Sequence, residues 1–260
     1  MSTCQLDALS ATSLAIVERH NACWAQGDIA GIEALYHPDM VFIDHFAGSR
    51  YTGSALREHV RDIIARSALD TLEYLDRPRV DGDTVFLRYC EVIRAANGDA
   101  LLSVSACDSV RVADGQIIEI NEYALPLQQP GQPQRKQAAA SKIGLSPRAL
   151  GYLLKDLALY FEQQQPYLEP GLSLSDVARA SGYTRNQISY ALNQGLGLSF
   201  YQYLNRARIH HVLASDSAIS IVERARAAGF RSTSTFYSAF RAVTGHLPGD
   251  LPKSPGLNSG

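Results

Sequence analysis

Hydrophobic positions recur with two different periods along the chain, and the change between them divides it. From residue 143 nearly to the end, apolar residues recur every three to four positions, which predicts helices. In the first 125 residues, helical spacing gives way after about residue 68 to the alternation typical of strands. The segment between them, residues 126–142, has three Pro and almost no large apolar side chains. Such a segment cannot bury enough surface to fold, which predicts a linker.

Residues 1–125 are expected to form helices followed by strands. The predicted helices cover residues 10–26, a short stretch ending at Tyr36, and residues 54–68; the predicted strands cover residues 40–44, 72–80, 84–95, 100–112 and 116–125. Turn residues at 97–99 and 114–115 connect the later strands as hairpins. Helices first and a long meander later predict an α+β domain, with a curved antiparallel sheet wrapped over its helices.

Residues 143–253 are expected to form an all-α domain with tandem helix-turn-helix units. Ser173 and Asp176, and then Thr184 and Gln187, have the three-residue spacing of capping boxes. Gly182 lies between the two predicted helices and allows a tight turn. Two short helices joined in this way predict a helix-turn-helix.

The segment ARAAGFRSTSTFYSAFRAVTGHLPG, residues 225–249, predicts a second unit of the same kind. Gly229 is placed to end one helix, Ser232 to cap the next and Gly245 to end it. Phe236 and Phe240 are four residues apart, so they share a helix face and are expected to be buried together.

The net charge of -2 conceals two halves of opposite sign. Residues 1–130 contain 10 Lys and Arg against 19 Asp and Glu, whereas residues 131–260 contain 14 against 7. A basic half joined to an acidic half indicates that the C-terminal half contacts a polyanion.

Neither a membrane partner nor secretion is expected. No apolar run approaches the ~20 residues that span a bilayer, and no charged start followed by an apolar core marks a signal peptide. We therefore expect a cytoplasmic protein. Cys4, Cys23, Cys90 and Cys107 lack metal-ligand or redox-pair spacing, so they are interpreted as reduced structural thiols, with a redox sensor as the alternative.

Three polar residues interrupt apolar faces in the first domain. Asp108 shares a strand face with Val104, Ala106 and neighbouring valines, Asp44 follows Phe42 by two positions, and His20 lies on the apolar face of the first helix. Burying a carboxylate is costly, so each group must be paired, hydrogen-bonded or neutralised. Each is either a satisfied polar group at the core's edge or part of a small-molecule pocket. For the second case, the predicted ligand-binding residues are His20, Trp24, Asp44, Asp108 and Tyr123.

The stretch WAQGDIAGIEALYHPDMVFIDHFAGSRYTGSALREHV and the later DSVRVADGQIIEINEY resemble the SnoaL-like and ketosteroid isomerase-like cone fold. By this resemblance, Asp44 matches the general base of the isomerases and Asp108 the acid that donates to the oxyanion. His20 stands where those enzymes carry a donor Tyr, which departs from the isomerase pattern. The resemblance also implies dimerisation through the open face of the sheet.

The stretches LSLSDVARASGYTRNQIS, GLSFYQYLNRARI and AGFRSTSTFYSAFRAVTGHLP resemble the AraC/XylS family of bacterial transcription regulators, in family order and spacing. Three positions depart from the family. Arg224 stands where a buried aliphatic residue is usual, Arg226 follows on the same helix, and Leu247 replaces the Thr before Pro248. The Arg residues are expected either to extend to the surface or to contact a phosphate.

Helical phase predicts which side chains contact DNA. Ile188 and Leu192 point inward in the first recognition helix, as do Phe236 and Phe240 in the second. The outward residues, with one in the turn, are Arg185, Asn186, Ser189, Tyr190, Asn193, Arg231, Thr233, Ser234, Ser238 and Arg241.

The leading hypothesis is a DNA-binding transcription regulator that acts on double-stranded DNA as a homodimer. A small apolar effector would bind the cone domain, without metal, cofactor or catalytic residues. Two alternatives remain open: the cone domain is a dimerisation module without ligand, or it is an isomerase or cyclase.

Overall fold

The computed structural model describes residues 3–127, 143–215 and 219–250, which fall into two compact units, Met1–Lys155 and Asp156–Gly260. Most of the predicted linker lies outside the described residues, since only positions 126 and 127 of it are described. The division between the units falls within helix α4 (Pro147–Gln164), whose first residues therefore group with the first unit.

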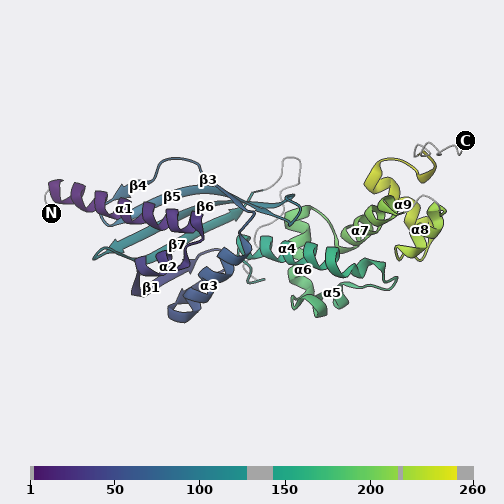
Figure 1. Cartoon of the computed structure of the whole chain (residues 1–260), viewed down its shortest axis with the longest axis horizontal. Helices are drawn as coiled ribbons and strands as arrows, with labels where there is room; N and C mark the ends of the chain where they lie inside the picture. The colour runs from purple at the N-terminus through teal and green to yellow at the C-terminus, as the bar shows by residue number, and fades with distance from the viewer. Residues whose placement is uncertain (1–2, 128–142, 216–218, 251–260) are drawn as a thin grey trace, which may run out of the picture. The chain divides into compact units, whose positions relative to one another are not determined.

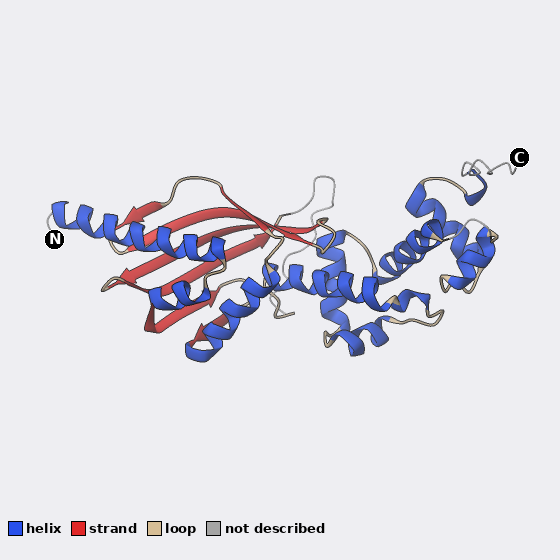
Figure 2. Cartoon of the chain, in the orientation of Figure 1, coloured by secondary structure: helices blue, strands red, loops and turns tan. Residues whose placement is uncertain are grey.

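The first unit is a seven-stranded sheet with helices packed on one face (Figures 1 and 2). The helices are α1 (Thr3–Gln26), α2 (Ile29–Leu35) and α3 (Gly53–Arg66). The strands are β1 (Tyr36–Asp44), β2 (Ser49–Thr52), β3 (Thr71–Tyr74), β4 (Arg79–Asp81), β5 (Thr84–Arg94), β6 (Ala100–Ala113) and β7 (Gln116–Pro126). The strand order is β2-β1-β7-β6-β5-β3, with β4 also paired to β5. The α+β fold with a sheet over helices is confirmed.

Several local predictions for this unit were wrong. The first helix starts at Thr3 rather than residue 10, because Leu6 and Leu9 reach Gly82 and the Ser10 hydroxyl accepts the Gly82 N–H at 3.0 Å. Residues 72–80 form two strands rather than one, since Pro78 between them has no N–H to donate.

The sheet is also not wholly antiparallel. β1 starts at Tyr36 instead of residue 40, and it runs parallel to β7, while the other pairs are antiparallel. The short β2 was not predicted.

The core of the first unit lies between the helices and the inner face of the sheet. Alternate residues of the three long strands point inward, and Val85, Ile93, Val110 and Ile117 are at most 2% exposed. Gly31 lets α2 approach α1, because a Cβ there would come 2.7 Å from the Cys23 sulfur.

The second unit is helical and contains the two predicted helix-turn-helix motifs. Its elements after α4 are the 3-10 turn Pro166–Leu168, α5 (Leu174–Ser181), α6 (Arg185–Ala191), the π-turn Leu192–Leu196, α7 (Phe200–Ala214), α8 (Ile221–Ala227), α9 (Thr233–Thr244) and the 3-10 turn Pro248–Asp250. Helices α5 and α6 form the first helix-turn-helix, and α8 and α9 form the second (Figure 1). Helix α7 lies between the two in the chain.

Side-chain caps define the ends of these short helices. The predicted capping boxes are confirmed: Ser173 pairs with Asp176, and Thr184 with Gln187. Ser232 caps α9, and Gly245 ends it with φ of 78°. Ser199 and Ser220 begin two further capping boxes that the sequence reading did not identify. These local hydrogen bonds satisfy backbone N–H groups that no helical partner can reach.

The second helix-turn-helix closes over an aromatic core. Phe236 and Phe240 are fully buried, and their ring centroids are 5.6 Å apart. Gly229 has φ of 88°, and a Cβ there would come 2.7 Å from the Tyr167 carbonyl oxygen, so both conformation and space require glycine. The predicted turn and the burial of the two Phe are thus confirmed.

Candidate ligand cavity and candidate DNA-contacting helices

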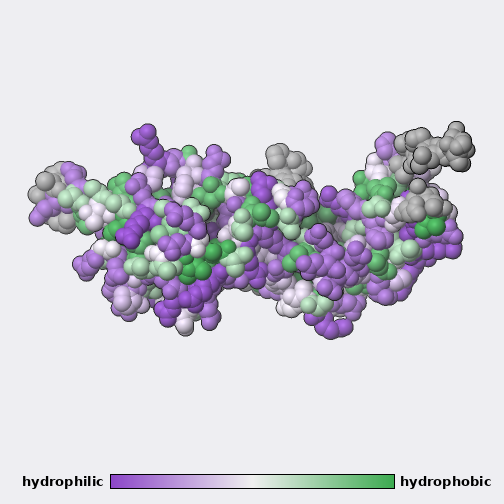
Figure 3. Space-filling model, in the orientation of Figure 1, coloured by the Kyte–Doolittle hydropathy of each residue, from purple (hydrophilic) through white to green (hydrophobic). Residues whose placement is uncertain are grey.

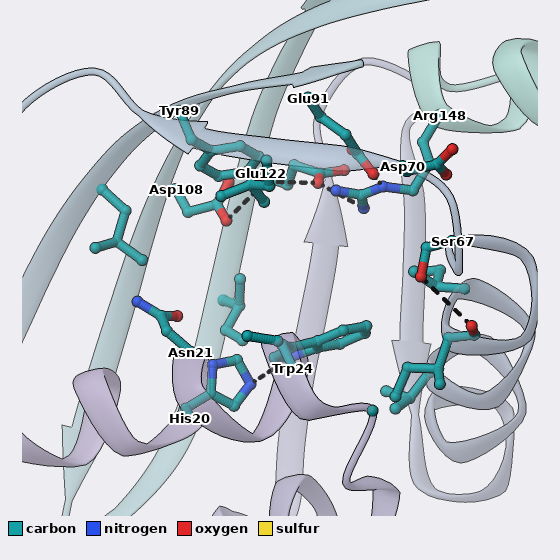
Figure 4. Close-up of a pocket in the computed structure, with 18 of the residues that line it drawn as sticks. His20, Asn21, Trp24, Ser67, Asp70, Tyr89, Glu91, Asp108, Glu122 and Arg148 are labelled. Atoms are coloured by element: carbon teal, nitrogen blue, oxygen red, sulfur yellow. Dashed lines mark hydrogen bonds and ion pairs between the residues drawn. The ribbon is translucent and has the colours of Figure 1, made fainter. Parts of the chain in front are cut away.

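A cavity of about 640 Å³ lies in the first unit between the helices and the inner face of the sheet (Figure 4). Aromatic and aliphatic side chains form most of its walls, among them Trp24, Tyr36, Phe42, Leu87 and Ile120. A volume of this size suits a small organic molecule, since ligand pockets usually span ~300–1,000 Å³.

Strand register brings acidic residues together at one end of the cavity. Leu87 of β5 pairs with Asp108 of β6, Asp108 pairs with Glu122 of β7, and Glu122 pairs with Asp44 of β1. Paired residues share a sheet face, so three carboxyl groups from three different strands form one row.

Arg148, in the first turn of α4, neutralises part of this acidic row. Its Nε donates to Glu91 Oε2 at 3.0 Å and its Nη1 to Glu122 Oε1 at 2.9 Å. The three side chains are 4 to 15% exposed, so the cluster is largely withdrawn from water. The Tyr89 hydroxyl lies 3.1 Å from Asp108 Oδ2 and 3.3 Å from Glu122 Oε1. A continuous polar network therefore runs from Arg148 to Asp108.

Burial dominates the electrostatics of the network. Burial, reinforced by the charge of Glu122, holds the pKa of Asp108 well above its usual range, which favours the protonated acid. Burial also raises the pKa of Glu122, although Arg148 opposes that shift. Burial by itself lowers the pKa of Arg148, but Glu122 and Glu91 outweigh it and raise the pKa.

A second polar group faces the cavity from α1. The Trp24 indole N–H donates to His20 Nε2 at 2.9 Å, and the Tyr36 hydroxyl lies 3.1 Å from the same nitrogen. His20 is 6% exposed, and burial lowers its pKa to about 4, although nearby Asn21 opposes the shift. The imidazole is therefore neutral at physiological pH.

The structure brings together three of the five predicted ligand-binding residues: His20, Trp24 and Asp108 line the cavity. Asp44 does not line it, because its Oδ1 accepts the N–H groups of Phe46 and Ala47, each at 2.9 Å, in the turn after β1. Tyr123 does not line it either. It is 51% exposed on the other face of the sheet, where it stacks on His45 at 4.3 Å.

Placing Asp44 and Tyr123 in the pocket is therefore corrected. One oxygen of the Asp44 carboxylate, the group that matches the general base of the isomerases, is bound by the turn after β1.

Sequence reasoning missed Tyr89, Glu91, Glu122 and Arg148. The signal that singled out Asp108 was also present for the two glutamates: Glu91 alternates with inward Tyr89 and Ile93, and Glu122 with Ile120. Nothing in the sequence pattern connects Arg148 with the cavity, because it belongs to a helix beyond the predicted linker.

In α6, the predicted DNA-contacting residues are only partly free. Arg185 and Asn186 are exposed, whereas Ser189, Tyr190 and Asn193 are half-buried. Asn193 lies in the π-turn that follows α6, and its side-chain amide donates to the Ser189 carbonyl at 2.8 Å. Ile188 and Leu192 are fully buried, as helical phase predicted.

In α9 and the turn before it, all five predicted residues are exposed. They are Arg231, Thr233, Ser234, Ser238 and Arg241. Tyr237 was not predicted, but at 41% exposure it lies beside Ser238 and Arg241 in the helix sequence. The outer side of α9 is therefore rich in hydrogen-bonding groups, and its inner side is apolar.

Arg224 stands where a buried aliphatic residue is usual, and it forms hydrogen bonds that such a residue could not form. Its Nη1 donates to the carbonyls of Val212 and Ser215, at 3.2 and 3.4 Å, and so binds the C-terminal end of α7. Cations at helix C-termini are favourable. Arg224 is thus a structural contact between α7 and α8.

The described residues contain no helix that is both long and apolar enough to cross a membrane. Within the same part of the chain, no group of three or more His, Cys, Asp or Glu side chains is arranged to hold a metal ion. Cys23, Cys90 and Cys107 are free thiols.

Two curated relatives match slightly less than half of the chain. The chain is 32% identical over 115 residues to the melibiose operon regulatory protein of Escherichia coli (strain K12), a match that covers 44% of this chain and 37% of the relative. It is 28% identical over 130 residues to the HTH-type transcriptional regulator GlxA of Rhizobium meliloti (strain 1021), covering 49% of this chain and 38% of the relative. The matches thus cover less than two fifths of these relatives.

Solved structures match slightly less than half of the chain at low identity. An NTF2-like protein from Mesorhizobium loti is 24% identical with a TM-score of 0.38, covering 45% of this chain and 93% of that one. An NTF2-like protein from Burkholderia xenovorans LB400 is 15% identical with a TM-score of 0.37, covering 45% and 91%.

Family models match both halves of the chain. One describes a SnoaL-like domain and matches residues 17–120; the other describes a helix-turn-helix domain and matches residues 177–254. The chain is therefore similar to a SnoaL-like domain in its N-terminal half and to a helix-turn-helix domain in its C-terminal half.

Proposed function

We propose that this protein is a sequence-specific DNA-binding transcription regulator of the cytoplasm, controlled by a small molecule in the cavity of its first unit. The observation that carries the proposal is the construction of α6 and α9. Each is a capped, short helix that buries one apolar side and presents exposed polar side chains on the other. The similarity of part of the chain to two regulators supports the same function.

Contact with bases is assigned to the exposed residues. Asn186 can bond an adenine edge with both amide atoms, and Arg185 or Arg241 can bond guanine or phosphate. Ser and Thr hydroxyls at the start of α9 reach bases or phosphates. Two recognition helices in neighbouring major-groove segments require an operator with two blocks about 34 Å apart.

Control by a ligand would pass through Arg148. This residue closes one end of the cavity, and it belongs to the helix whose last residues are part of the second unit. A ligand that rearranges the contacts of Arg148 with Glu91 and Glu122 would change how that helix is held. The resulting change in DNA affinity is expected to be modest, ~1–3 kcal/mol, as for most coupled sites.

A homodimer through the outer face of the sheet completes the proposal. Phe86, Tyr123 and Leu125 project from that face with 43 to 51% of their surface exposed. The opposite, helix-covered side of the unit, seen in Figure 3, mixes hydrophilic and hydrophobic residues. Exposed apolar groups on neighbouring strands are typical of an association surface.

Fluorescence anisotropy of the full chain with fragments of the host genome tests the proposal. We expect selective binding that weakens with salt, with a log–log slope of ~0.9 per phosphate contacted. Arg185→Ala and Arg241→Ala should each weaken binding, whereas Arg57→Ala, an exposed Arg of the first unit, should not. Binding without sequence preference, or equal loss in all three variants, would refute it.

A further inference from the structure

Three residues that line the cavity each have a buried polar atom without a hydrogen-bond partner among the described residues: His20 Nδ1 on α1, Asp108 Oδ1 on β6, and Asp70 Oδ2. The other oxygen of Asp70 already binds the Lys155 ammonium and the Arg94 N–H, which leaves His20 and Asp108 as the two groups without a charged partner. Figure 4 shows the two side chains on opposite walls, one on the helix and one on the sheet. Buried polar atoms are nearly always hydrogen-bonded, so this pair marks where a ligand would complete the structure.

The geometry fixes His20 Nδ1 as a hydrogen-bond donor. The indole N–H of Trp24 can only donate, and it points at His20 Nε2 from 2.9 Å. Nε2 must therefore be the nitrogen without a proton, which places the proton of the neutral imidazole on Nδ1. The Asn21 side chain also interacts with His20, but no hydrogen bond of regular length and angle joins Nδ1 to a described protein atom, so this N–H is available to an acceptor from outside the protein.

The two contacts of the Tyr89 hydroxyl favour Asp108 Oδ1 as an acceptor. The Tyr89 hydroxyl has one proton, yet it lies within hydrogen-bond distance of both Asp108 Oδ2 and Glu122 Oε1. Both contacts are favourable if a proton on Asp108 Oδ2 is donated to the Tyr89 oxygen, while Tyr89 donates to Glu122. A proton on Oδ1 would leave two oxygen lone pairs facing each other. If Asp108 is ionised, Oδ1 still accepts.

Charge disfavours an anion in this cavity. The cavity-lining guanidinium belongs to Arg148, which already contacts two carboxylates, Glu91 and Glu122. The His59 imidazole, the other basic group beside Arg148, is neutral because burial and then Arg148 lower its pKa to about 4. An incoming carboxylate would meet an acidic row without an uncommitted cation.

We propose that the cavity binds an aromatic molecule carrying two polar groups at separate positions: an oxygen acceptor for His20 Nδ1–H, and a hydroxyl or ammonium donor for Asp108 Oδ1. The inference deepens the proposed ligand control and depends on it for biological meaning. It also reverses the isomerase-like expectation for Asp108, which here accepts from the ligand instead of donating to it.

A series of naphthalene probes that differ only in their polar substituents tests the inference. 6-Methoxy-2-naphthol and 2-aminomethyl-6-methoxynaphthalene offer the acceptor with a hydroxyl or an ammonium donor. 2,6-Dimethoxynaphthalene lacks the donor, 2-naphthol lacks the methoxy acceptor, and 6-methoxy-2-naphthoate carries a carboxylate. The same polar substituents on benzene and anthracene rings cover a range of ligand sizes. Calorimetry on the full chain without DNA measures each Kd.

At least one of the two donor-bearing methoxy probes should bind tenfold or more tightly than the dimethoxy compound, and the carboxylate should bind least. The Kd values of the hydroxyl and ammonium probes show which donor is preferred. Asp108→Leu, which has the same branching but is larger, should abolish the preference for a donor while leaving dimethoxynaphthalene binding largely unchanged, and the isosteric Asp108→Asn provides a second variant. His20→Phe should abolish the advantage of 6-methoxy-2-naphthol over 2-naphthol. Tyr123→Phe, on the outer face, should change nothing.

The inference would be overturned if the carboxylate probe bound most tightly, or if probes with and without the donor bound equally. It would also be overturned if no probe bound, whatever its ring size. The DNA experiment separates this outcome from failure of the proposed function. If selective DNA binding persists while the head-group preference is absent, only the ligand class is wrong. If the preference holds without DNA binding, the regulator proposal is wrong.

Discussion

In the first unit, charged side chains lie buried beside a cavity, whereas in the second unit the charged side chains of the recognition helices face solvent. Glu91 and Glu122 are 5% and 3% exposed and depend on Arg148. Around α9, by contrast, the core is built from Phe236, Phe240 and other apolar residues, and the exposed side is polar. Buried polar groups lower stability but create a site inside the fold, while an apolar core leaves the surface available for contact with a partner.

Arg208 is the exception that sharpens this contrast. This side chain of α7 is 5% exposed, but its guanidinium donates to the carbonyls of Tyr167 and Glu169, both at 2.8 Å, and lies over the Phe230 ring. It holds backbone together and faces no cavity residue. Burial of a charge therefore indicates a site only where the cluster also borders open space.

The two units can be followed separately in solution. The chain has one Trp, Trp24, which lines the cavity in the first unit. Trp fluorescence therefore reports unfolding of the first unit, and far-UV circular dichroism reports helices in both.

The largest effects are expected from Arg148→Met. The substitution leaves Glu91 and Glu122 buried without their partner, which typically costs ~3–5 kcal/mol. The midpoint of the Trp fluorescence transition in urea should fall accordingly. Adding Glu91→Gln and Glu122→Gln to the same chain should recover much of the loss, because no unpaired charge remains. An unchanged midpoint in Arg148→Met would show that the cluster is hydrated rather than buried.

A loss of similar or smaller size is expected from Phe236→Ala. Phe236 is fully buried against Phe230 and Phe240, and truncating such a ring usually costs ~3–5 kcal/mol. Helical dichroism should melt earlier while the Trp24 transition stays in place. Tyr237→Ala, at the exposed neighbouring position, is the matched control and should have little effect. A shift of the Trp24 transition would contradict separate unfolding of the units.

Removing a cap should have a smaller effect. Thr184 accepts the Gln187 N–H at the start of α6, and replacement of such a cap by Ala costs ~1 kcal/mol. Thr184→Ala should therefore be less stable, whereas Thr184→Ser keeps a hydroxyl that can form the cap. The two variants must differ in thermal stability measured by circular dichroism. Equal stability of both would mean that packing of Ile188, not the cap, sets the start of the helix.

The subtlest effect is a change in pH dependence on removing the Asp108 carboxyl. Since the folded-state pKa of Asp108 is raised, the folded chain keeps a proton that the unfolded chain loses above about pH 4. Asp108 therefore destabilises the native state increasingly as the pH rises towards its folded pKa. Relative to the unmodified chain, Asp108→Asn should gain stability between pH 5 and pH 8 in urea titrations. A constant difference across that range would show that Asp108 is ionised in the fold.

The second unit was largely predictable because its signals are local. Caps such as Ser173 with Asp176, the Gly229 turn and the Phe236–Phe240 pair each involve residues within four positions of one another or a single backbone conformation. Short-range hydrogen bonds and helical phase then determine which side is buried.

The cavity was only partly predictable because strand pairing assembles it. Alternation correctly placed Asp108 on the inner face and holds for Glu91 and Glu122 as well, whereas Tyr123, predicted to bind ligand, lies on the outer face. Asp44 satisfied the pattern too, yet it does not line the cavity, and its Oδ1 accepts two N–H groups of the turn after β1.

The sequence by itself determined two structural classes, the helix boundaries of the second half and the inward side of each recognition helix, since these follow from spacing over a few residues. Only the tertiary structure decided which polar groups meet. Register places Asp108 beside Glu122, and α4 brings Arg148 to Glu91, 57 positions away in the chain. Such contacts depend on the arrangement of whole elements, on which the local pattern of apolar and polar residues carries no information.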